Sequence, residues 1–186
     1  MPSTPLEREI KLRFASPDAA RDAILAVGAT PLRGRRLQED CLLDTPGGFL
    51  RDRRSILRVR MEAGKSRLTF KGPVQPSVMK LREELETVIG DGEVVLQLFG
   101  ALGFEPWFRY QKYREEFSHE DIVIAIDETP IGTFVELEGS EAGIAALAER
   151  LGRLPTDYVL ESYRGLFVAW CESTGSTAAH MVFDDA

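Results

Sequence analysis

Cysteine is scarce in this chain of 186 residues, and the two thiols, Cys41 and Cys171, have no second metal-binding side chain close by in the sequence. That pattern excludes a zinc ribbon and argues against a disulfide-stabilised scaffold. The chain also lacks any run approaching the roughly 20 uncharged apolar residues that a membrane span requires. Its N-terminal segment, residues 1–14, carries charges too often for a secretory signal. We therefore expect a cytoplasmic protein with reduced thiols and no membrane partner.

Positive charge is in deficit as well. Lys and Arg total 23 and Asp and Glu total 30, which gives a formal net charge of −7. Since non-specific nucleic-acid binding needs a basic surface, nucleic acid is not an expected partner. The histidines are His119 and His180, one beside a predicted turn and one near the C-terminus, which argues against a histidine metal site or a Ser-His-Asp triad. Glycine-rich phosphate loops are also missing, and this disfavours Rossmann and P-loop nucleotide sites.

The chain is, by contrast, rich enough in apolar residues, at 44%, to bury a substantial core in one domain. Apolar spacing typical of helices, with capping residues at the ends, predicts helices over residues 16–28, 91–103, 140–152 and 156–170. Residues 173–177 are composed like a linker. We therefore predict a single domain over residues 1–172 and a flexible C-terminal tail over residues 173–186.

Between the helical segments the apolar pattern changes to a period of two, which is typical of strands. The predicted strands are Glu7–Phe14, Gln38–Leu43, Ser55–Met61, Arg67–Lys71, Leu81–Val88, Phe108–Phe117, Ile122–Asp127 and Thr133–Glu138. Eight strands with few helices between them favour an α+β fold with a mainly antiparallel sheet. A sheet of this size can close into a β-barrel.

Charged residues alternate with apolar ones along nearly every predicted strand, so each strand has one charged face. For a single strand the usual interpretation is a solvated face opposite the core. Here, however, the charges are grouped by type, as in Glu7, Glu9 and Lys11 or in Arg58 and Arg60. If the sheet closes and helices cover its apolar outside, these faces meet in a charged interior. Such an interior would suit a polyanion together with a cation.

The charged segments form an ordered series that resembles the CYTH superfamily, also called triphosphate tunnel metalloenzymes. The matching segments are Glu7-Arg8-Glu9-Ile10-Lys11, Ile56-Leu57-Arg58-Val59-Arg60, Leu68-Thr69-Phe70-Lys71-Gly72-Pro73, Arg82-Glu83-Glu84-Leu85-Glu86, Tyr110-Gln111-Lys112-Tyr113-Arg114-Glu115, Ile126-Asp127, Gly132-Thr133-Phe134-Val135-Glu136-Leu137-Glu138 and Glu161-Ser162-Tyr163-Arg164. The resemblance extends from Leu6 to about Phe167 and is strongest to the class IV adenylate cyclases. It implies an eight-stranded antiparallel β-barrel, the triphosphate tunnel, with helices packed on the outside.

The resemblance also implies roles for individual side chains. Guanidinium groups offer paired donors that match phosphate oxygens, and lysines add point charges. The implied phosphate-binding residues are Lys11, Arg58, Arg60, Lys71, Arg82, Lys112 and Arg114. The implied ligands of Mg²⁺ or Mn²⁺, which prefer oxygen donors, are Glu7, Glu9, Asp127, Glu136 and Glu138. The implied catalytic residues are Glu7, Glu9, Lys11 and Asp127. Glu84 and Glu86 could join the ligands or pair with the tunnel arginines.

The activity that the resemblance implies is a metal-dependent conversion of ATP to cyclic AMP and pyrophosphate. A triphosphatase acting on inorganic tripolyphosphate, thiamine triphosphate or nucleoside triphosphates is the alternative, because the same charged tunnel serves both reactions. A non-catalytic binder of polyphosphate or nucleotides is a third possibility, although a simple polyanion binder would not need so many acids. The class IV cyclases further suggest a homodimer.

Three other features have simpler interpretations. The cluster Arg51, Arg53 and Arg54 is typical of a solvated loop and less so of a lip that steers anions. Tyr163 is expected to pack a helix against the barrel, and Asp44 to cap its own turn.

Overall fold

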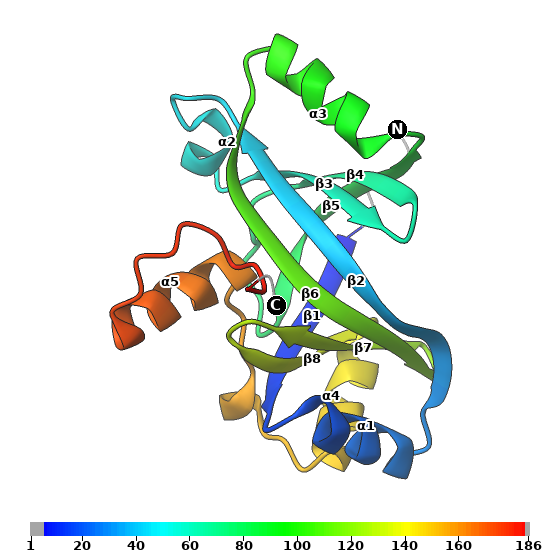
Figure 1. Cartoon of the computed structure of the whole chain (residues 1–186). Helices are drawn as coiled ribbons and strands as arrows, with labels where there is room; N and C mark the ends of the chain where they lie inside the picture. The colour runs from blue at the N-terminus through cyan, green and yellow to red at the C-terminus, as the bar shows by residue number, and fades with distance from the viewer. Residues whose placement is uncertain (1–5, 185–186) are drawn as a thin grey trace.

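The computed structural model describes residues 6–184, and within that range eight antiparallel strands form a closed barrel (Figure 1). The strands are β1 (Leu6–Phe14), β2 (Thr30–Asp44), β3 (Ile56–Glu62), β4 (Lys65–Lys71), β5 (Lys80–Ile89), β6 (Glu105–His119), β7 (Ile122–Thr129) and β8 (Gly132–Glu138). Around the barrel they follow the order β1-β5-β4-β3-β2-β6-β7-β8. The predicted α+β class, with its antiparallel β-barrel and outer helices, is confirmed.

Two strands are much longer than the sequence pattern predicts. β2 begins at Thr30 rather than Gln38, and β6 begins at Glu105 and ends at His119. The two strands pair with each other along nearly their whole length, but the register shifts between Pro31 and Arg36. These irregular, largely exposed residues break the period-two pattern, so the alternation alone could not mark them as strand.

The helices of the described chain lie outside the barrel, and most begin at a capping side chain. They are α1 (Pro17–Ala26), α2 (Phe49–Asp52), α3 (Gly92–Ala101), α4 (Glu141–Arg150), the 3-10 turn η1 (Pro155–Asp157) and α5 (Tyr163–Thr174). Ser16, Asp91, Ser140 and Ser162 each accept a backbone N–H of the first turn of α1, α3, α4 and α5. The helix expected over residues 156–170 therefore begins later, at the Ser162 cap. The four-residue α2 is too short to show a helical period.

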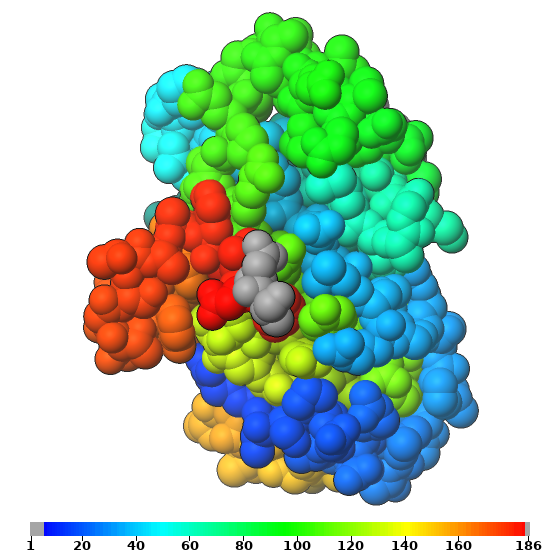
Figure 2. All heavy atoms as spheres, in the orientation of Figure 1, coloured from blue at the N-terminus to red at the C-terminus, as the bar shows by residue number. Residues whose placement is uncertain are grey.

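The apolar core lies between the barrel wall and the helices, as expected if the strands turn their charged faces inward. One cluster fills the space between the barrel and helices α1 and α4, with Ile10, Ile24 and Leu147 almost fully buried. A second lies under α5 and contains Phe108 and Phe167. Figures 1 and 2 show α1 and α4 side by side at one end of the molecule, and α3 at the other.

The C-terminal segment beyond α5, for which the composition predicts a flexible tail, contacts the barrel in its described part. Met181 is fully buried, and its backbone exchanges hydrogen bonds with Arg109 and Gln111 of β6. The Phe183 ring lies 5.2 Å from that of Tyr113. This part of β6 has a free edge because β7 pairs with β6 only from Tyr113 onward. In Figure 2 the segment, in red, lies against the side of the barrel.

None of the helices formed by residues 6–184 combines the length and the hydropathy needed to cross a bilayer.

Candidate active site

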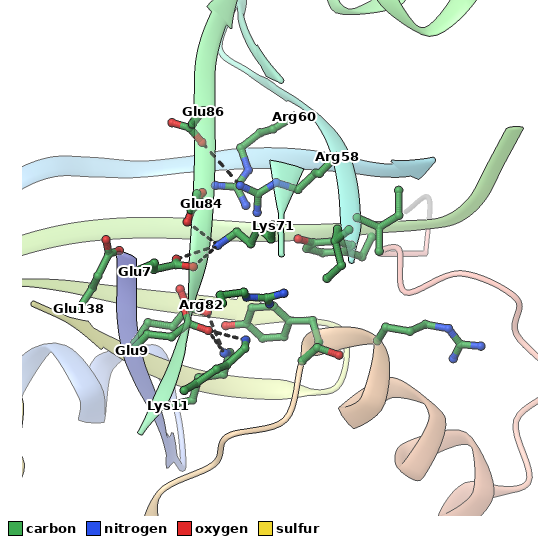
Figure 3. Close-up of a pocket in the computed structure, with 18 of the residues that line it drawn as sticks. Glu7, Glu9, Lys11, Arg58, Arg60, Lys71, Arg82, Glu84, Glu86 and Glu138 are labelled. Atoms are coloured by element: carbon green, nitrogen blue, oxygen red, sulfur yellow. Dashed lines mark hydrogen bonds and ion pairs between the residues drawn. The ribbon is translucent and has the colours of Figure 1, made fainter. Parts of the chain in front are cut away.

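A tunnel of about 1030 Å³ runs through the barrel, and its lining is strongly charged (Figure 3). Among the described residues, the lining includes thirteen Lys or Arg and nine Glu side chains. The cations are Lys11, Arg33, Arg51, Arg54, Arg58, Arg60, Arg67, Lys71, Lys80, Arg82, Lys112, Arg114 and Arg164. The tunnel is thus net positive inside a chain whose formal charge is −7, and it is suited to an anion.

All seven predicted phosphate-binding residues reach this tunnel, from strands β1, β3, β4, β5 and β6. Lys11, Arg58, Arg60, Lys71, Arg82, Lys112 and Arg114 all line it. Lys11 and Lys112 are 2% and 1% exposed, respectively. Burial on this scale is costly for a cation that has no counter-charge. The carboxylates that pair with these cations therefore determine where the cations lie.

Asp40 on β2 is the counter-charge for the arginines of β3. Its Oδ1 accepts a hydrogen bond from Arg60 Nε at 2.9 Å and lies 3.4 Å from Arg58 Nε. Burial disfavours the ionised carboxyl group, but Arg60 and Arg58 outweigh burial and hold the pKa of Asp40 below its usual value. Arg58 also donates to Thr69 at 3.1 Å. The two guanidinium groups are thereby fixed side by side on one wall.

Lys71 connects the carboxylates of β1 and β5. Its Nζ lies 2.6 Å from Glu7 and 2.9 Å from Glu84 (Figure 3). Burial, and then the nearby charge of Glu9, raise the pKa of Glu7 to about 7 in spite of Lys71. Glu86 pairs with Arg67 at 2.5 Å and lies 3.7 Å from Arg58. Glu84 and Glu86 therefore do pair with tunnel cations, Glu84 with a lysine and Glu86 with arginines.

A second group of charges lies deeper, around Lys11. Its Nζ is 3.0 Å from Glu9 and 3.4 Å from Glu136, and Glu9 also pairs with Lys80 at 2.5 Å. Burial opposes ionisation of Glu9, yet Lys11 and Lys80 keep its pKa well below the ordinary value. Burial lowers the pKa of Lys80 to about 8 even beside Glu9. Glu9 is thus an ionised carboxylate held between two lysines.

Asp127 on β7 is fully buried and anchors the remaining cations. Arg114 donates to both of its carboxylate oxygens at 2.6 Å, and Lys112 donates to Oδ2 at 2.7 Å. Tyr163 on α5 donates its hydroxyl to the same Oδ2 at 2.6 Å. Burial and the charge of Arg114 lower the pKa of Lys112 to about 8. Unlike the other predicted site residues, Asp127 is not part of the tunnel lining.

Of the five predicted metal ligands, four lie along the tunnel and Asp127 does not. Glu7, Glu9, Glu136 and Glu138 all line the tunnel and supply only oxygen donors, which suits a hard divalent cation. Burial and the charge of Glu9 raise the pKa of Glu138 to about 6, as expected where carboxylates repel one another. Within residues 6–184 no ion pair involves Glu138, and no three acidic, His or Cys side chains converge as a ready-made metal site. The oxygen donors therefore suit Mg²⁺ or Mn²⁺, but Glu7, Glu9 and Glu136 form ion pairs with lysines.

Several residues of the site were missed in the sequence. Asp40, Lys80 and Tyr110 are buried at the tunnel, and only their alternation on β2, β5 and β6 signals an inward position. Tyr163 packs against the barrel as predicted and, beyond that, reaches Asp127.

Asp44 caps its turn as predicted, because it accepts the N–H groups of Thr45, Leu50 and Arg51. Arg51 and Arg54 line the tunnel mouth. They belong to the cluster for which a solvated loop was the favoured interpretation, and they remain largely exposed.

The model of the CYTH domain matches residues 5–161. "Putative adenylate cyclase MJ0240" of Methanocaldococcus jannaschii is 33% identical over 140 residues, which are 75% of this chain and 79% of that protein. Among solved structures, PH1012 from Pyrococcus horikoshii OT3 is 26% identical, with a TM-score of 0.73 over 86% of this chain and 98% of that one.

A further solved structure is HpAC1 from Hippeastrum, named a putative adenylyl cyclase with a dominant triphosphatase activity. It is 22% identical, with a TM-score of 0.66 over 88% of this chain and 96% of that one, and thus shares the fold. The barrel, its charged tunnel and the match over residues 5–161 agree, and the chain belongs to the CYTH domain family.

Proposed function

We propose that this protein is a metal-dependent enzyme that acts on a triphosphate bound in the tunnel. The observation that carries the proposal is the excess of cations over carboxylates in the lining of a tunnel of about 1030 Å³. A triphosphate tail carries about four negative charges near neutral pH and needs several fixed cations around it. A cavity of this size also has room for an organic group, since typical ligand pockets measure about 300–1,000 Å³.

The cations have distinct tasks in this proposal. Arg58 and Arg60, held in parallel by Asp40, would each present paired N–H donors to non-bridging phosphate oxygens. Lys71 and Lys112 would add charge on the neighbouring walls. When the triphosphate binds, these four cations would exchange part of their contacts with carboxylates for contacts with phosphate oxygens.

The carboxylates have a second task. Glu7, Glu9, Glu136 and Glu138 would hold Mg²⁺ or Mn²⁺, which neutralises phosphate charge and polarises an attacking oxygen. Glu7 and Glu9 would take part in catalysis by holding this ion, because both line the tunnel and supply oxygen donors.

Two reactions are compatible with this chemistry. We favour attack of the ribose 3′-hydroxyl of ATP on the α-phosphorus, which yields cyclic AMP and pyrophosphate, in line with the name of the M. jannaschii relative. Trp107, Ile56 and Leu42 line the tunnel together and could accept a nucleoside. The alternative is hydrolysis of a triphosphate, supported by the activity named for HpAC1.

A product assay tests the proposal. The purified protein is incubated with ATP, tripolyphosphate or thiamine triphosphate and with Mg²⁺ or Mn²⁺, at neutral and alkaline pH, and products are identified by phosphorus NMR and chromatography. Cyclic AMP with pyrophosphate would establish the cyclase, and orthophosphate without cyclic AMP would establish the triphosphatase. A Glu7→Gln, Glu9→Gln double variant should lose turnover, whereas Glu149→Gln on the exposed face of α4 should not. Binding without turnover under every condition would leave only a non-catalytic binder.

A further inference from the structure

Tyr163 is the first residue of α5, outside the barrel, but its side chain lies at the tunnel. It is 6% exposed and is part of the tunnel lining. Its hydroxyl donates to Asp127 Oδ2 at 2.6 Å, and Asp127 is fully buried. A phenol hydroxyl is an uncharged donor near neutral pH. A helix that covers the barrel thus contributes a hydrogen bond to the charged interior.

The acceptor of that hydrogen bond also positions two tunnel cations. Arg114 and Lys112 donate to the same carboxylate group at 2.6 and 2.7 Å. The direction in which Asp127 points therefore decides where both cations lie. A third, uncharged donor on Oδ2 limits rotation of the carboxylate without competing for its charge.

The ring of Tyr163 acts on the cations as well. Its centroid lies 4.8 Å from Lys112 Nζ and 5.3 Å from Lys11 Nζ. An ammonium group at this distance from an aromatic face is attracted to it, more so when desolvated. The Tyr163 ring therefore contacts two buried lysines, one on β1 and one on β6.

Tyr163 is itself held from three sides. Val159 exchanges two backbone hydrogen bonds with Lys11, at 2.8 and 3.2 Å, which ties the approach to α5 to strand β1. The rings of Phe134 and Tyr110 lie 5.6 and 6.0 Å from the Tyr163 ring. The buried Met181 of the C-terminal segment belongs to the same cluster. This packing fixes the ring and aims its hydroxyl at Asp127.

We propose that Tyr163 is a positioning residue for the triphosphate site, which orients Asp127 and through it sets Lys112 and Arg114 for the phosphates. The inference rests on the proposed binding of a triphosphate in the tunnel. It gives α5 and the C-terminal segment a role in binding and not only in stability.

The experiment measures tripolyphosphate binding by calorimetry, together with thermal unfolding, for wild type, Tyr163→Phe and Tyr113→Phe. Tyr163→Phe keeps the ring and removes only the hydroxyl group. We expect the dissociation constant to rise about 10-fold, the loss of one hydrogen bond to a charged group, while the unfolding temperature changes little. Tyr113→Phe, on the outer face of β6, should bind as wild type does.

A double-mutant cycle with Asp127→Asn then tests whether Tyr163 acts through Asp127. Non-additive losses in affinity support the proposal. Equal affinity of Tyr163→Phe and wild type would overturn it, as would a loss that tracks the fall in unfolding temperature alone. If the wild type binds neither tripolyphosphate nor ATP, with or without Mg²⁺, the proposed function itself fails and the inference fails with it.

Discussion

The buried lysines and arginines that line the tunnel each have a charged partner among the described residues, except Arg82. The Arg82 side chain on β5 is 5% exposed and lines the tunnel, yet within residues 6–184 it forms neither an ion pair nor a hydrogen bond, and its Nε has no partner. An unpaired buried cation destabilises a fold. Its retention is understandable if a ligand anion supplies the missing charge.

The first prediction concerns this residue. Arg82→Met, which keeps the volume and removes the charge, should leave the ligand-free protein as stable as the wild type or stabilise it by about 1 kcal/mol. The same variant should bind tripolyphosphate at least about 10-fold more weakly, the loss of a charge-assisted hydrogen bond. Urea unfolding and calorimetry measure the two effects. A marked loss of stability would show that Arg82 has a partner within the protein.

The second prediction concerns pH. Burial opposes ionisation of Glu62, but Gln38 and Arg36 outweigh it and lower its pKa to about 2. Because the folded pKa is below the unfolded value of about 4.3, the stabilisation by Glu62 is present above about pH 5 and is lost as pH falls toward about 2. Glu62→Gln should therefore cost about 2 kcal/mol at pH 7 and much less at pH 3.

Urea unfolding at the two pH values measures this difference. Glu172→Gln, an exposed carboxylate on α5, is the matched control and should change stability equally little at both. A Glu62→Gln effect that is the same at pH 7 and pH 3 would contradict the ion pair between Glu62 and Arg36, whose Nε lies 2.8 Å from the carboxylate.

At the scale of elements, the chain passes close to its neighbours at the junction of β8 and α4. Gly139 has a φ of 155°, and a Cβ there would lie 2.6 Å from Ile122 Cδ1 and 2.8 Å from the Asp121 carbonyl oxygen. Gly139→Ala should therefore destabilise the protein by about 1–3 kcal/mol. Gly34→Ala on β2, where nothing lies within 4 Å, is the control. Equal unfolding temperatures for the two variants would rule out this steric account.

The strands could be predicted from the sequence to a large extent, but the partners of their charged side chains could not. On β1 and β3, charged and apolar residues alternate along most of the strand, which identifies both strands and the inward direction of Glu9 and Arg58. The pattern fails for the first half of β2, where register shifts interrupt the alternation. Ion-pair partners such as Asp40 and Lys80 could not be predicted, because they depend on strand register across the closed barrel. The packing of Tyr163 against the barrel could be predicted, but its hydrogen bond to Asp127 could not, because that contact joins α5 to β7.

At the scale of the whole molecule, the positive tunnel predicts strong stabilisation by ligand. Tripolyphosphate at 100 times its dissociation constant should stabilise the fold by about 2.7 kcal/mol. For a protein of this size that corresponds to a rise in unfolding temperature of about 5–10 °C. Thermal scans with and without tripolyphosphate measure the rise. Sodium chloride at matched ionic strength is the control, and an equal rise with it would show that no specific site exists.

The tunnel has one more consequence at this scale. A polar cavity of about 1030 Å³ is filled by solvent, and at about 30 Å³ for each molecule of liquid water it holds on the order of 30 of them. A triphosphate that enters must displace a large share of this water into the bulk. Its affinity therefore depends on the chemical potential of water, and osmolytes excluded from the tunnel should strengthen binding without touching any residue of the site.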